Sequence, residues 1–407
     1  MNCRHCAAPL QQTFLDLGFA PPSNAYLRAE QLGQAERYFP LKLRVCTACW
    51  LVQTEDYAAA GELFSADYAY FSSTSSSWCT HAQRYVAAIT ERLRLDNQSL
   101  VIEVAANDGY LLKNFVAAGI PCLGIEPTAS TAAAAEALGI PVLREFFGEA
   151  LGQRLAGEGQ QADLIIGNNV FAHVPAINDF SRGLKAALKP TGTLTLEFPH
   201  LLQLIEQVQF DTVYHEHFSY LSLYSVQRIL AAAGLAVYDV EELPTHGGSL
   251  RVYACHAEAQ RPVSDAVTAL LQHERHQGLR DIATYLAFQA RADAVKNDFL
   301  AFLLQQKKAG RRVAAYGAAA KGNTLLNYAG VKPDLLAFVC DAAPSKQGQY
   351  LPGSHIPVFA PEHLRTERPD VVVLLPWNLA EELVRQLAFI EQWGGRFATA
   401  IPALKVF

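Results

Sequence analysis

Ten consecutive residues, 213–222, read VYHEHFSYLS and bring two histidines, a glutamate and two tyrosines together. Histidine has an unperturbed pKa of ~6.5, so His217 could accept a proton at neutral pH, and Glu216 or Tyr214 could orient its ring. We favour this general-base interpretation over two others. If this segment were a strand, His215 and His217 would share one face and could bind a metal, although H-E-H lacks the spacing of H-E-x-x-H zinc enzymes. A buried histidine–glutamate contact could also be purely structural.

Two C-x-x-C pairs lie near the start of the chain: Cys3 with Cys6, and Cys46 with Cys49. Each pair can present two thiolates to one ion from a tight turn, and together they complete the tetrahedral four-cysteine set of a structural zinc. Such a closed shell leaves no place for water, so the zinc should stabilise the fold and take no part in a reaction. Four unrelated buried thiols are the alternative. We predict a zinc-binding lobe over residues 1–70, which is too small to fold well without a metal.

The composition is that of a globular protein with several domains. The chain has 407 residues, of which 51% are hydrophobic and 18% are charged, and one domain usually takes ~100–200 residues. The formal net charge of −6 gives no reason to expect a nucleic-acid partner. The N-terminus lacks the pattern of a signal peptide, and no apolar run approaches the ~18–20 residues of a membrane span. We therefore expect a cytoplasmic protein without membrane contact. A single chain would suffice as a functional unit, so we also expect a monomer.

From residue 99 onward the chain alternates strand and helix patterns. Buried apolar runs occur in SLVIEVAAND, IPCLGIEP, IPVLREFF, ADLIIGNNVFAHV and GTLTLEFPH, with helical patterns between them. This βαβα order predicts a doubly wound, parallel, Rossmann-like α/β sheet, with its ligand at the carboxyl ends of the strands. A helix and a two-strand hairpin follow before residue 256, which is how methyltransferase sheets characteristically end.

Polar residues at the ends of these strands predict a cofactor that contains adenosine. Glu126 closes the second strand, where an acidic side chain can accept hydrogen bonds from both ribose hydroxyls. The first turn lacks the G-x-G-x-x-G that lets backbone amides approach a diphosphate, and its acidic residues suit a cation such as S-adenosylmethionine. The predicted cofactor-binding residues are Glu103, Ala105, Asn107, Gly109, Tyr110, Glu126, Asn168 and Asn169.

The C-terminal third begins a second α/β unit with RRVAAYGAAAKGNTLLNYAG. Lys321 at its first helix could form an anion site, although the glycines around it could equally serve only a tight strand-to-helix turn. The spacing matches neither dinucleotide nor P-loop motifs, so we expect no second cofactor. We predict three domains, 1–70, 71–255 and 256–407. The predicted substrate-binding residues are His215, His246, Ser249, Arg251, Tyr316 and Lys321.

Taken together, these motifs give the chain a resemblance to a known family, the nucleotide-sugar C-methyltransferases. Members of that family add a branching methyl group to a keto deoxysugar bound to dTDP or a similar nucleotide. The motifs that carry the resemblance are the four-cysteine lobe, NDGYLL, NNVFAHV, YHEHFSYLS, THGGSLR and YGAAAKGNTLLNY. The resemblance implies a class I S-adenosylmethionine-dependent methyltransferase domain, a structural zinc and a C-terminal domain that helps to hold the sugar nucleotide. One departure is Ala105-Ala106, where methyltransferases in general have a glycine-rich turn.

The same resemblance implies roles for individual residues. His217 would remove the proton beside the sugar carbonyl, and the resulting enolate would attack the methyl group in line. Tyr214 and Glu216 match positions that line the family's site, His173 would lie near the base, and Tyr68 would face the sugar. The commonest family reaction is at C3 beside a 4-keto group, while C5 is also used.

Two functions other than methyl transfer would fit parts of this sequence. An NAD-dependent oxidoreductase would share the strand order, but the absent G-x-G-x-x-G argues against it. A sugar-nucleotide binding module without enzymatic activity would keep the C-terminal unit but would not need His217 above a cofactor pocket.

Overall fold

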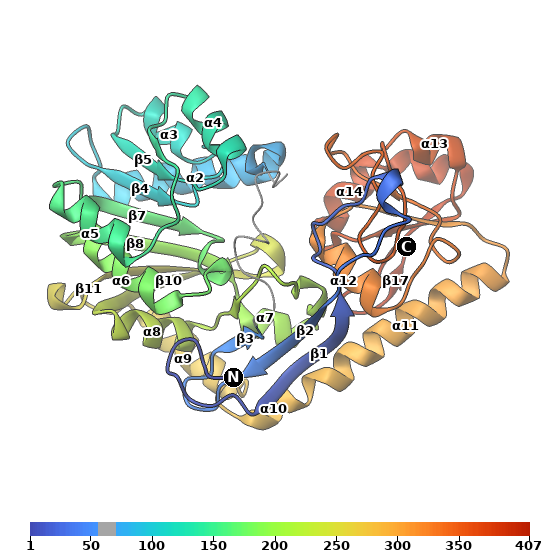
Figure 1. Ribbon diagram of the computed structural model, residues 1–407, viewed down its shortest axis with the longest axis horizontal. Coiled ribbons are helices and arrows are strands. Elements are labelled where there is room, and N and C mark those ends of the chain that lie inside the picture. Colours follow the sequence, from blue (N-terminus) through green and yellow to red (C-terminus); the bar gives the residue numbers. More distant parts are fainter. Residues whose placement is uncertain (56–70) are drawn as a thin grey trace.

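The computed structural model describes residues 1–55 and 71–407. It contains three β-sheets, and two of them form large lobes (Figure 1). The central domain forms one lobe and the C-terminal domain the other. The N-terminal strands and the long helix α11 (Phe288–Lys308) run along the base of the molecule and connect the two lobes.

The N-terminal lobe is an antiparallel sheet with one strand from elsewhere in the chain. Its own strands are β1 (Gln12–Ala20), β2 (Phe39–Val45) and β3 (Val52–Thr54). The fourth strand, β9 (Ser219–Tyr220), belongs to the histidine-rich segment and pairs with β3 through Val52 and Tyr220. The zinc-binding lobe and the predicted catalytic segment thus share one backbone ladder.

The central domain is the doubly wound sheet that the sequence predicts, in the order β10-β11-β8-β7-β4-β5-β6. Five strands run parallel, and the hairpin of β10 and β11 adds two antiparallel strands at one edge. The strands are β4 (Val101–Val104), β5 (Cys122–Ile125), β6 (Val142–Leu143), β7 (Ala162–Asn168), β8 (Leu188–Pro199), β10 (Leu235–Leu243) and β11 (Ser249–His256). The helices are α2 (Ser76–Leu93), α3 (Leu112–Ala117), α4 (Ala129–Ala137), α5 (Glu149–Gly157), α6 (Ile177–Ala187), α7 (Leu201–Glu206) and α8 (Leu223–Ala232).

The C-terminal domain is a second α/β sheet in the order β14-β13-β12-β15-β16-β17. Its strands are β12 (Val313–Tyr316), β13 (Val339–Cys340), β14 (Val358–Phe359), β15 (Val371–Leu374), β16 (Arg396–Thr399) and β17 (Lys405–Val406), and its helices are α12 (Ala320–Tyr328), α13 (His363–Glu367) and α14 (Ala380–Gln386). Before α11, two helices lead out of the central domain, α9 (Asp265–His276) and α10 (Ile282–Leu286). Val267 and Leu270 of α9 belong to the core of the central sheet.

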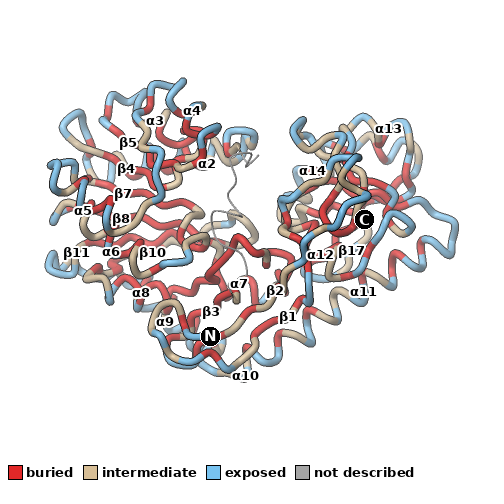
Figure 2. Tube along the Cα trace, viewed as in Figure 1, coloured by how far each residue is buried: buried red, intermediate tan, exposed pale blue. Residues whose placement is uncertain are grey.

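One apolar core joins the N-terminal lobe to the C-terminal domain. Phe14 of β1 stacks on Phe288 of α11 with ring centroids 4.7 Å apart, and Tyr285 meets the edge of the same Phe14 ring. This core continues into the C-terminal sheet through Phe299 and Val313. Buried segments follow the strands in both lobes (Figure 2). Because apolar burial is shared across the boundary, the N-terminal lobe and the C-terminal domain hold one orientation.

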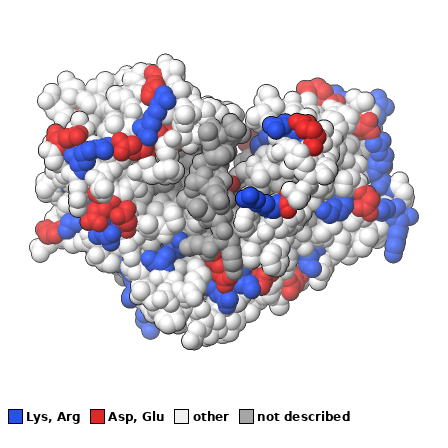
Figure 3. All heavy atoms as spheres, viewed as in Figure 1, with Lys and Arg blue, Asp and Glu red and all other residues white. Residues whose placement is uncertain are grey.

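The surface shows acidic and basic side chains side by side on the face drawn in Figure 3. Such mixing does not produce a broad field of one sign, in keeping with the modest net charge of −6. Within the part of the chain that the structure describes, no helix combines the length and apolar character of a membrane span.

Candidate active site

The histidine-rich segment is a tight turn between the 3-10 helix η4 (Phe210–Thr212) and β9. The amide of His217 donates to the carbonyl of Tyr214 at 3.0 Å, and the two rings approach to 4.0 Å between centroids. The turn separates the two histidines, because His215 instead reaches towards the carbonyl of Phe39 in β2, at 3.4 Å. His215 and His217 therefore do not form the paired strand face that a metal site would need.

His217 is buried among rings that keep it uncharged. His173 meets it edge to face with centroids 4.5 Å apart, and Tyr220 lies 5.8 Å away. Burial lowers the pKa of His217 well below its usual value, and the nearby His173, His246 and Lys321 lower the pKa further. Burial also lowers the pKa of His173, to about 4. At neutral pH the His217 ring is therefore free of a proton on one nitrogen and able to accept one.

Glu216 faces a residue that none of the sequence motifs contains. The side-chain amide of Asn24 donates to both carboxylate oxygens of Glu216, at 2.9 and 3.0 Å. Asn24 lies in the stretch PPSNAY, which by itself indicates only a loop. Sequence reasoning missed this contact because 192 residues separate the two partners along the chain.

Lys321 lies at the junction of the C-terminal domain with η4. Its ammonium donates to the side-chain oxygen of Asn378 at 3.0 Å and lies 4.9 Å above the Trp377 ring. Trp377 in turn donates to the carboxylate of Asp211 at 2.7 Å. Burial raises the pKa of Asp211 to about 6, although the charge of Lys321 opposes that shift. Burial lowers the pKa of Lys321. Asp211, Trp377 and Asn378 were not among the predicted site residues.

The turn after β4 has the shape of a cofactor loop without its usual glycines. Ala105 and Asn107 adopt positive φ angles of 59° and 50°, which are conformations that favour glycine. Gly109 has φ of 77°, and a Cβ there would lie 2.5 Å from Ile140 Cδ1. Glu126 stabilises this turn, because its carboxylate accepts hydrogen bonds from the backbone amides of Asn107 at 3.0 Å and Thr128 at 2.9 Å. The backbone thus compensates for the Ala105-Ala106 departure from a glycine-rich turn.

Three carboxylates, those of Glu103, Asp108 and Glu126, gather at this turn. Burial raises the pKa of Glu103 well above its usual value, and the charges of Glu126 and Asp108 raise it further. Several buried polar atoms here have no hydrogen-bond partner within residues 1–55 and 71–407: Glu103 Oε2, Asp108 Oδ1, both amide atoms of Asn168, and Asn169 Oδ1. Buried polar groups need partners, so this crevice fits a ligand that is polar and cationic. S-adenosylmethionine meets both requirements.

The entry to α2 covers this crevice. The amides of Ser72 and Ser73 donate to the side chains of Asn107 and Asp108, at 2.9 and 3.0 Å. Trp78 lies 6.0 Å from the Tyr110 ring and 5.1 Å from that of His246. Asn169 donates to or accepts from His246 at 3.0 Å. The structure therefore brings the predicted residues Tyr110, Asn169 and His246 to one place beside the first turn.

Other predicted substrate residues have partners inside the protein. Arg251 is buried and pairs with Glu197 at 2.7 Å and with Glu241 at 3.1 Å. Ser249 donates to the carbonyl of Thr245. Tyr316 packs into a core of the C-terminal sheet, where burial raises its pKa to about 12. Tyr68 lies outside the described residues.

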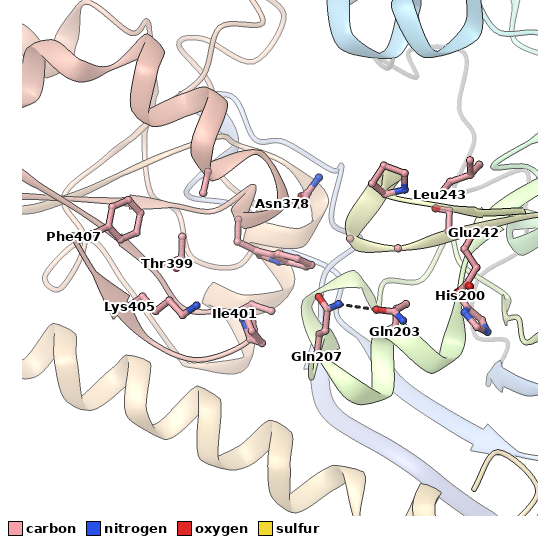
Figure 4. A pocket seen from close by; sticks show the side chains of 17 residues that line it. His200, Gln203, Gln207, Glu242, Leu243, Asn378, Thr399, Ile401, Lys405 and Phe407 are labelled. Atoms are coloured by element: carbon pink, nitrogen blue, oxygen red, sulfur yellow. Dashed lines mark hydrogen bonds between the residues drawn. The ribbon is translucent and has the colours of Figure 1, made fainter. Parts of the chain in front are cut away.

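A groove of about 690 Å³ runs between the central and C-terminal domains beside this site (Figure 4). Gln203 of α7 and Gln207, the residue after that helix, line one side, and Lys405 and Phe407 line the other. Trp377 and Asn378 line it as well, so the residues that contact Lys321 also border this groove.

The four cysteines of the two C-x-x-C pairs converge in the N-terminal lobe. Their sulfur atoms all lie within 4.8 Å of one another, with Cys3–Cys49 and Cys6–Cys46 each at 3.5 Å. Zn–S bonds of ~2.3 Å in a tetrahedron place sulfurs ~3.8 Å apart. The hydrogen bond with Cys49 lowers the pKa of Cys3 to about 4, which favours the thiolate form that zinc binds. The donor set fits zinc.

The two C-x-x-C pairs lie in turns with the same backbone conformation. The residue four positions after the first cysteine has a positive φ in both, 61° at Ala7 and 62° at Trp50. Ala7 donates to the carbonyl of Cys3, and Trp50 to that of Cys46. The side-chain amide of Gln53 donates to the Cys3 sulfur at 3.3 Å, which favours a thiolate there.

Three family models match the chain. They are a zinc binding domain over residues 3–64, a methyltransferase domain over residues 78–240, and a C-methyltransferase C-terminal domain over residues 244–402. The C-methyltransferase NovU of Streptomyces niveus is 35% identical over 406 residues, which is 100% of this chain and 96% of that protein.

Solved structures resemble less than half of the chain, at low identity. An S-adenosylmethionine-dependent methyltransferase from Clostridium acetobutylicum is 9% identical, with a TM-score of 0.34 over 43% of this chain and 90% of its own. Magnesium protoporphyrin IX methyltransferase from Synechocystis, with bound S-adenosylhomocysteine, is 16% identical, with a TM-score of 0.35 over 44% of this chain and 82% of its own. These likenesses are too distant to carry a further conclusion.

Replacing Cys49 by serine tests the zinc site. We expect metal analysis to find about one zinc per chain in the native protein and far less in Cys49→Ser, because a four-thiolate shell loses a ligand. Structural zinc contributes on the order of 10 kcal/mol of binding free energy to folding, so the melting temperature should fall as well. Cys79→Ser is the control, since Cys79 lies outside the cluster. Unchanged zinc content in Cys49→Ser would contradict the assignment.

Replacing Glu126 by alanine tests the cofactor crevice. We expect the affinity for S-adenosylhomocysteine, measured by calorimetric titration, to fall about 10- to 100-fold, as for a lost hydrogen bond to a charged group. The matched control is Glu136→Ala on α4, because Glu136 is exposed and pairs with Arg144. Equal affinities for Glu126→Ala and the native protein would show that the cofactor binds elsewhere.

Proposed function

The chain belongs to the C-methyltransferase family, and from that premise we propose that its substrate is a keto deoxysugar linked to a nucleotide, most simply dTDP. The methyl group would go to the ring carbon beside the ketone, with C3 as the expected position and C5 as the alternative. One observation carries this proposal: His217, a buried and uncharged histidine, stands in a ring cluster with Tyr214 and His173. Methyl transfer to carbon needs such a base, because the carbon must lose a proton before it can attack.

The match of residues 78–240 to a methyltransferase domain removes the NAD-dependent alternative. S-adenosylmethionine, when bound, supplies a methyl group on a positively charged sulfur. Glu126 would accept hydrogen bonds from its ribose, and Glu103 and Asp108 would attract its charge. Asn168, whose amide atoms lack partners among the described residues, would bind the remaining polar groups.

His217 would take the proton from the carbon beside the sugar ketone. The electron pair of the broken C–H bond would move into an enolate, whose carbon would bond to the methyl group. The sulfur–methyl bond of S-adenosylmethionine would break in the same step, and its electron pair would stay on the sulfur of S-adenosylhomocysteine. The hydroxyl of Tyr214 and the rings of His173 and His217 would surround the sugar and exclude water. Tyr68 stays a prediction for this wall.

The nucleotide end would lie towards the C-terminal domain. Lys321 is a half-buried cation held by Asn378 and Trp377, and we propose that it meets the diphosphate. His246 borders the same space through its contact with Asn169. This arrangement supports the division of work among the domains: residues 1–70 bind zinc, 71–255 bind the cofactor, and 256–407 help to hold the sugar nucleotide.

Replacing His217 by asparagine tests the base. With S-adenosylmethionine and dTDP-4-keto-6-deoxyglucose as the probe substrate, we expect kcat to fall by ~10²- to 10⁴-fold, the usual range for a positioned base. The affinity for S-adenosylhomocysteine should stay nearly unchanged. The ring position of the added methyl group, read by NMR, distinguishes C3 from C5.

His215→Asn is the matched control, since His215 points to the N-terminal lobe. A His217→Asn enzyme that keeps its turnover within a few-fold would show that another group or a water takes the proton.

The lowered pKa of His217 predicts the acid side of the pH profile. A base works only without its proton, and this ring loses its proton at a pH below the ordinary ~6.5 of histidine. We therefore expect kcat to stay constant from pH ~8 down to ~6.5 and to decline only below that range. Measuring kcat across this interval checks the prediction. A decline that begins above pH ~7 would contradict the uncharged state of His217.

A further inference from the structure

Asn24 connects the N-terminal lobe to the catalytic segment. It is exposed, whereas its partner Glu216 is buried with 3% of its surface accessible. The amide group of Asn24 donates to both oxygens of that carboxylate. One amide that bonds both oxygens fixes the direction of the carboxylate as well as its distance.

Asn24 lies at the centre of a short strap, residues 22–26, which rests on the C-terminal domain. Within the strap, Ala25 donates to the carbonyl of Pro22 and Tyr26 to that of Asn24, both at 3.0 Å. On one side of Asn24, the carbonyl of Ser23 accepts from the side chain of Asn323 at 2.6 Å. On the other side, the hydroxyl of Tyr26 donates to the carbonyl of Ala318. The strap is thus anchored on both sides of the residue that contacts Glu216.

The helix that anchors the strap also anchors the catalytic segment. Asn323 and Thr324 are neighbours in α12, and Thr324 donates to the carbonyl of Val213 at 2.7 Å. One helix therefore sets the positions of both Asn24 and the turn that bears Glu216. A short, rigid route of this kind can hold a hydrogen bond at a fixed length.

The fixed position of Glu216 restrains the histidines around the proposed base. The backbone of Glu216 hydrogen-bonds the ring of His173, and that ring meets the edge of His217 at 4.5 Å. The side-chain carboxylate of Glu216 accepts the hydrogen bonds from Asn24. Movement of the Glu216 side chain would therefore disturb the corner of the turn that supports both histidines.

We propose that Asn24 is a positioning residue for the methyl transfer, acting through Glu216 on the His173–His217 pair. The inference rests on the proposed function, since it takes His217 as the base. The strap is part of the N-terminal lobe in the sequence, but it contacts the C-terminal domain. The N-terminal lobe would therefore position the proposed base as well as bind zinc.

Two substitutions of Asn24 separate this role from simple packing. Asn24→Asp keeps the shape of the side chain but replaces the donor by a carboxylate facing Glu216, whereas Asn24→Ala removes the contact. With S-adenosylmethionine and dTDP-4-keto-6-deoxyglucose, we expect both variants to lose about 10- to 100-fold in kcat, as for a small misplacement of reacting groups. The affinity for S-adenosylhomocysteine and the melting temperature should stay close to those of the native protein.

The pH dependence of Asn24→Asp gives a second readout. Two facing carboxyl groups readily share one proton, and in this variant the shared proton restores a donor between the introduced carboxyl group and Glu216. The ratio of the variant's kcat to the native kcat should therefore rise as the pH falls. A purely structural role would leave this ratio constant.

Glu36→Gln is the control, because Glu36 contacts Gly353 and His355 of the C-terminal domain and not the catalytic segment. Native kcat in Asn24→Asp would overturn the proposal, and so would a change confined to KM, which would make Asn24 a substrate contact instead. Native protein that methylates no keto sugar nucleotide would overturn the proposed function itself. Loss of kcat in Glu216→Gln with native kcat in both Asn24 variants would overturn only the role of Asn24.

Discussion

The proposed catalytic segment, residues 213–220 of the central domain, is held by both the C-terminal domain and the N-terminal lobe, and the placement of His217 depends on that restraint. Thr324 of the C-terminal domain holds the carbonyl of Val213. At the other end, β9 pairs with β3 of the N-terminal lobe, and Thr54 donates to the carbonyl of Phe218. Because β3 begins just after Cys49, the folding of the cysteine cluster and the position of His217, the proposed base, are coupled through a backbone ladder.

Charge is divided between the two lobes in a way that suits two different ligands. The carboxylates of Glu103, Asp108 and Glu126 lie in the central domain, where like charge raises the pKa of Glu103. Lys321 lies in the C-terminal domain, and its charge lowers the pKa of His217 and of His246. A cationic cofactor would relieve the first repulsion, and an anionic substrate would offset the second. The histidines between these charges stay neutral, which is the state a general base needs.

The sequence predicted the elements that local pattern determines. Apolar periodicity identified the five parallel strands of the central sheet, and paired C-x-x-C spacing identified the four sulfurs that the structure brings together. It could not predict β9, because the pairing of Ser219 with Gln53 depends on residues far apart in the chain. Nor could it show that Arg251 is neutralised by Glu197 and Glu241, or that Asn24 meets Glu216. These contacts are set by tertiary packing, which leaves no periodic trace in the sequence.

In both α/β sheets, a carboxylate that follows a strand accepts hydrogen bonds from two backbone amides, but the surrounding residues differ. In the central sheet, Glu126 accepts from the amides of Asn107 and Thr128. In the C-terminal sheet, Asp341 follows β13 and accepts from the amides of Ala318 and Ala343, at 2.7 and 2.8 Å. Beside Asp341, however, Lys346 and Tyr26 both donate to the carbonyl of Ala318, so protein groups occupy this turn. Beside Glu126, buried polar atoms within the described residues still lack partners. The same backbone arrangement therefore lies beside polar atoms without partners in one sheet and beside the anchored strap in the other, so the two turns differ in their surrounding side chains and not in their fold.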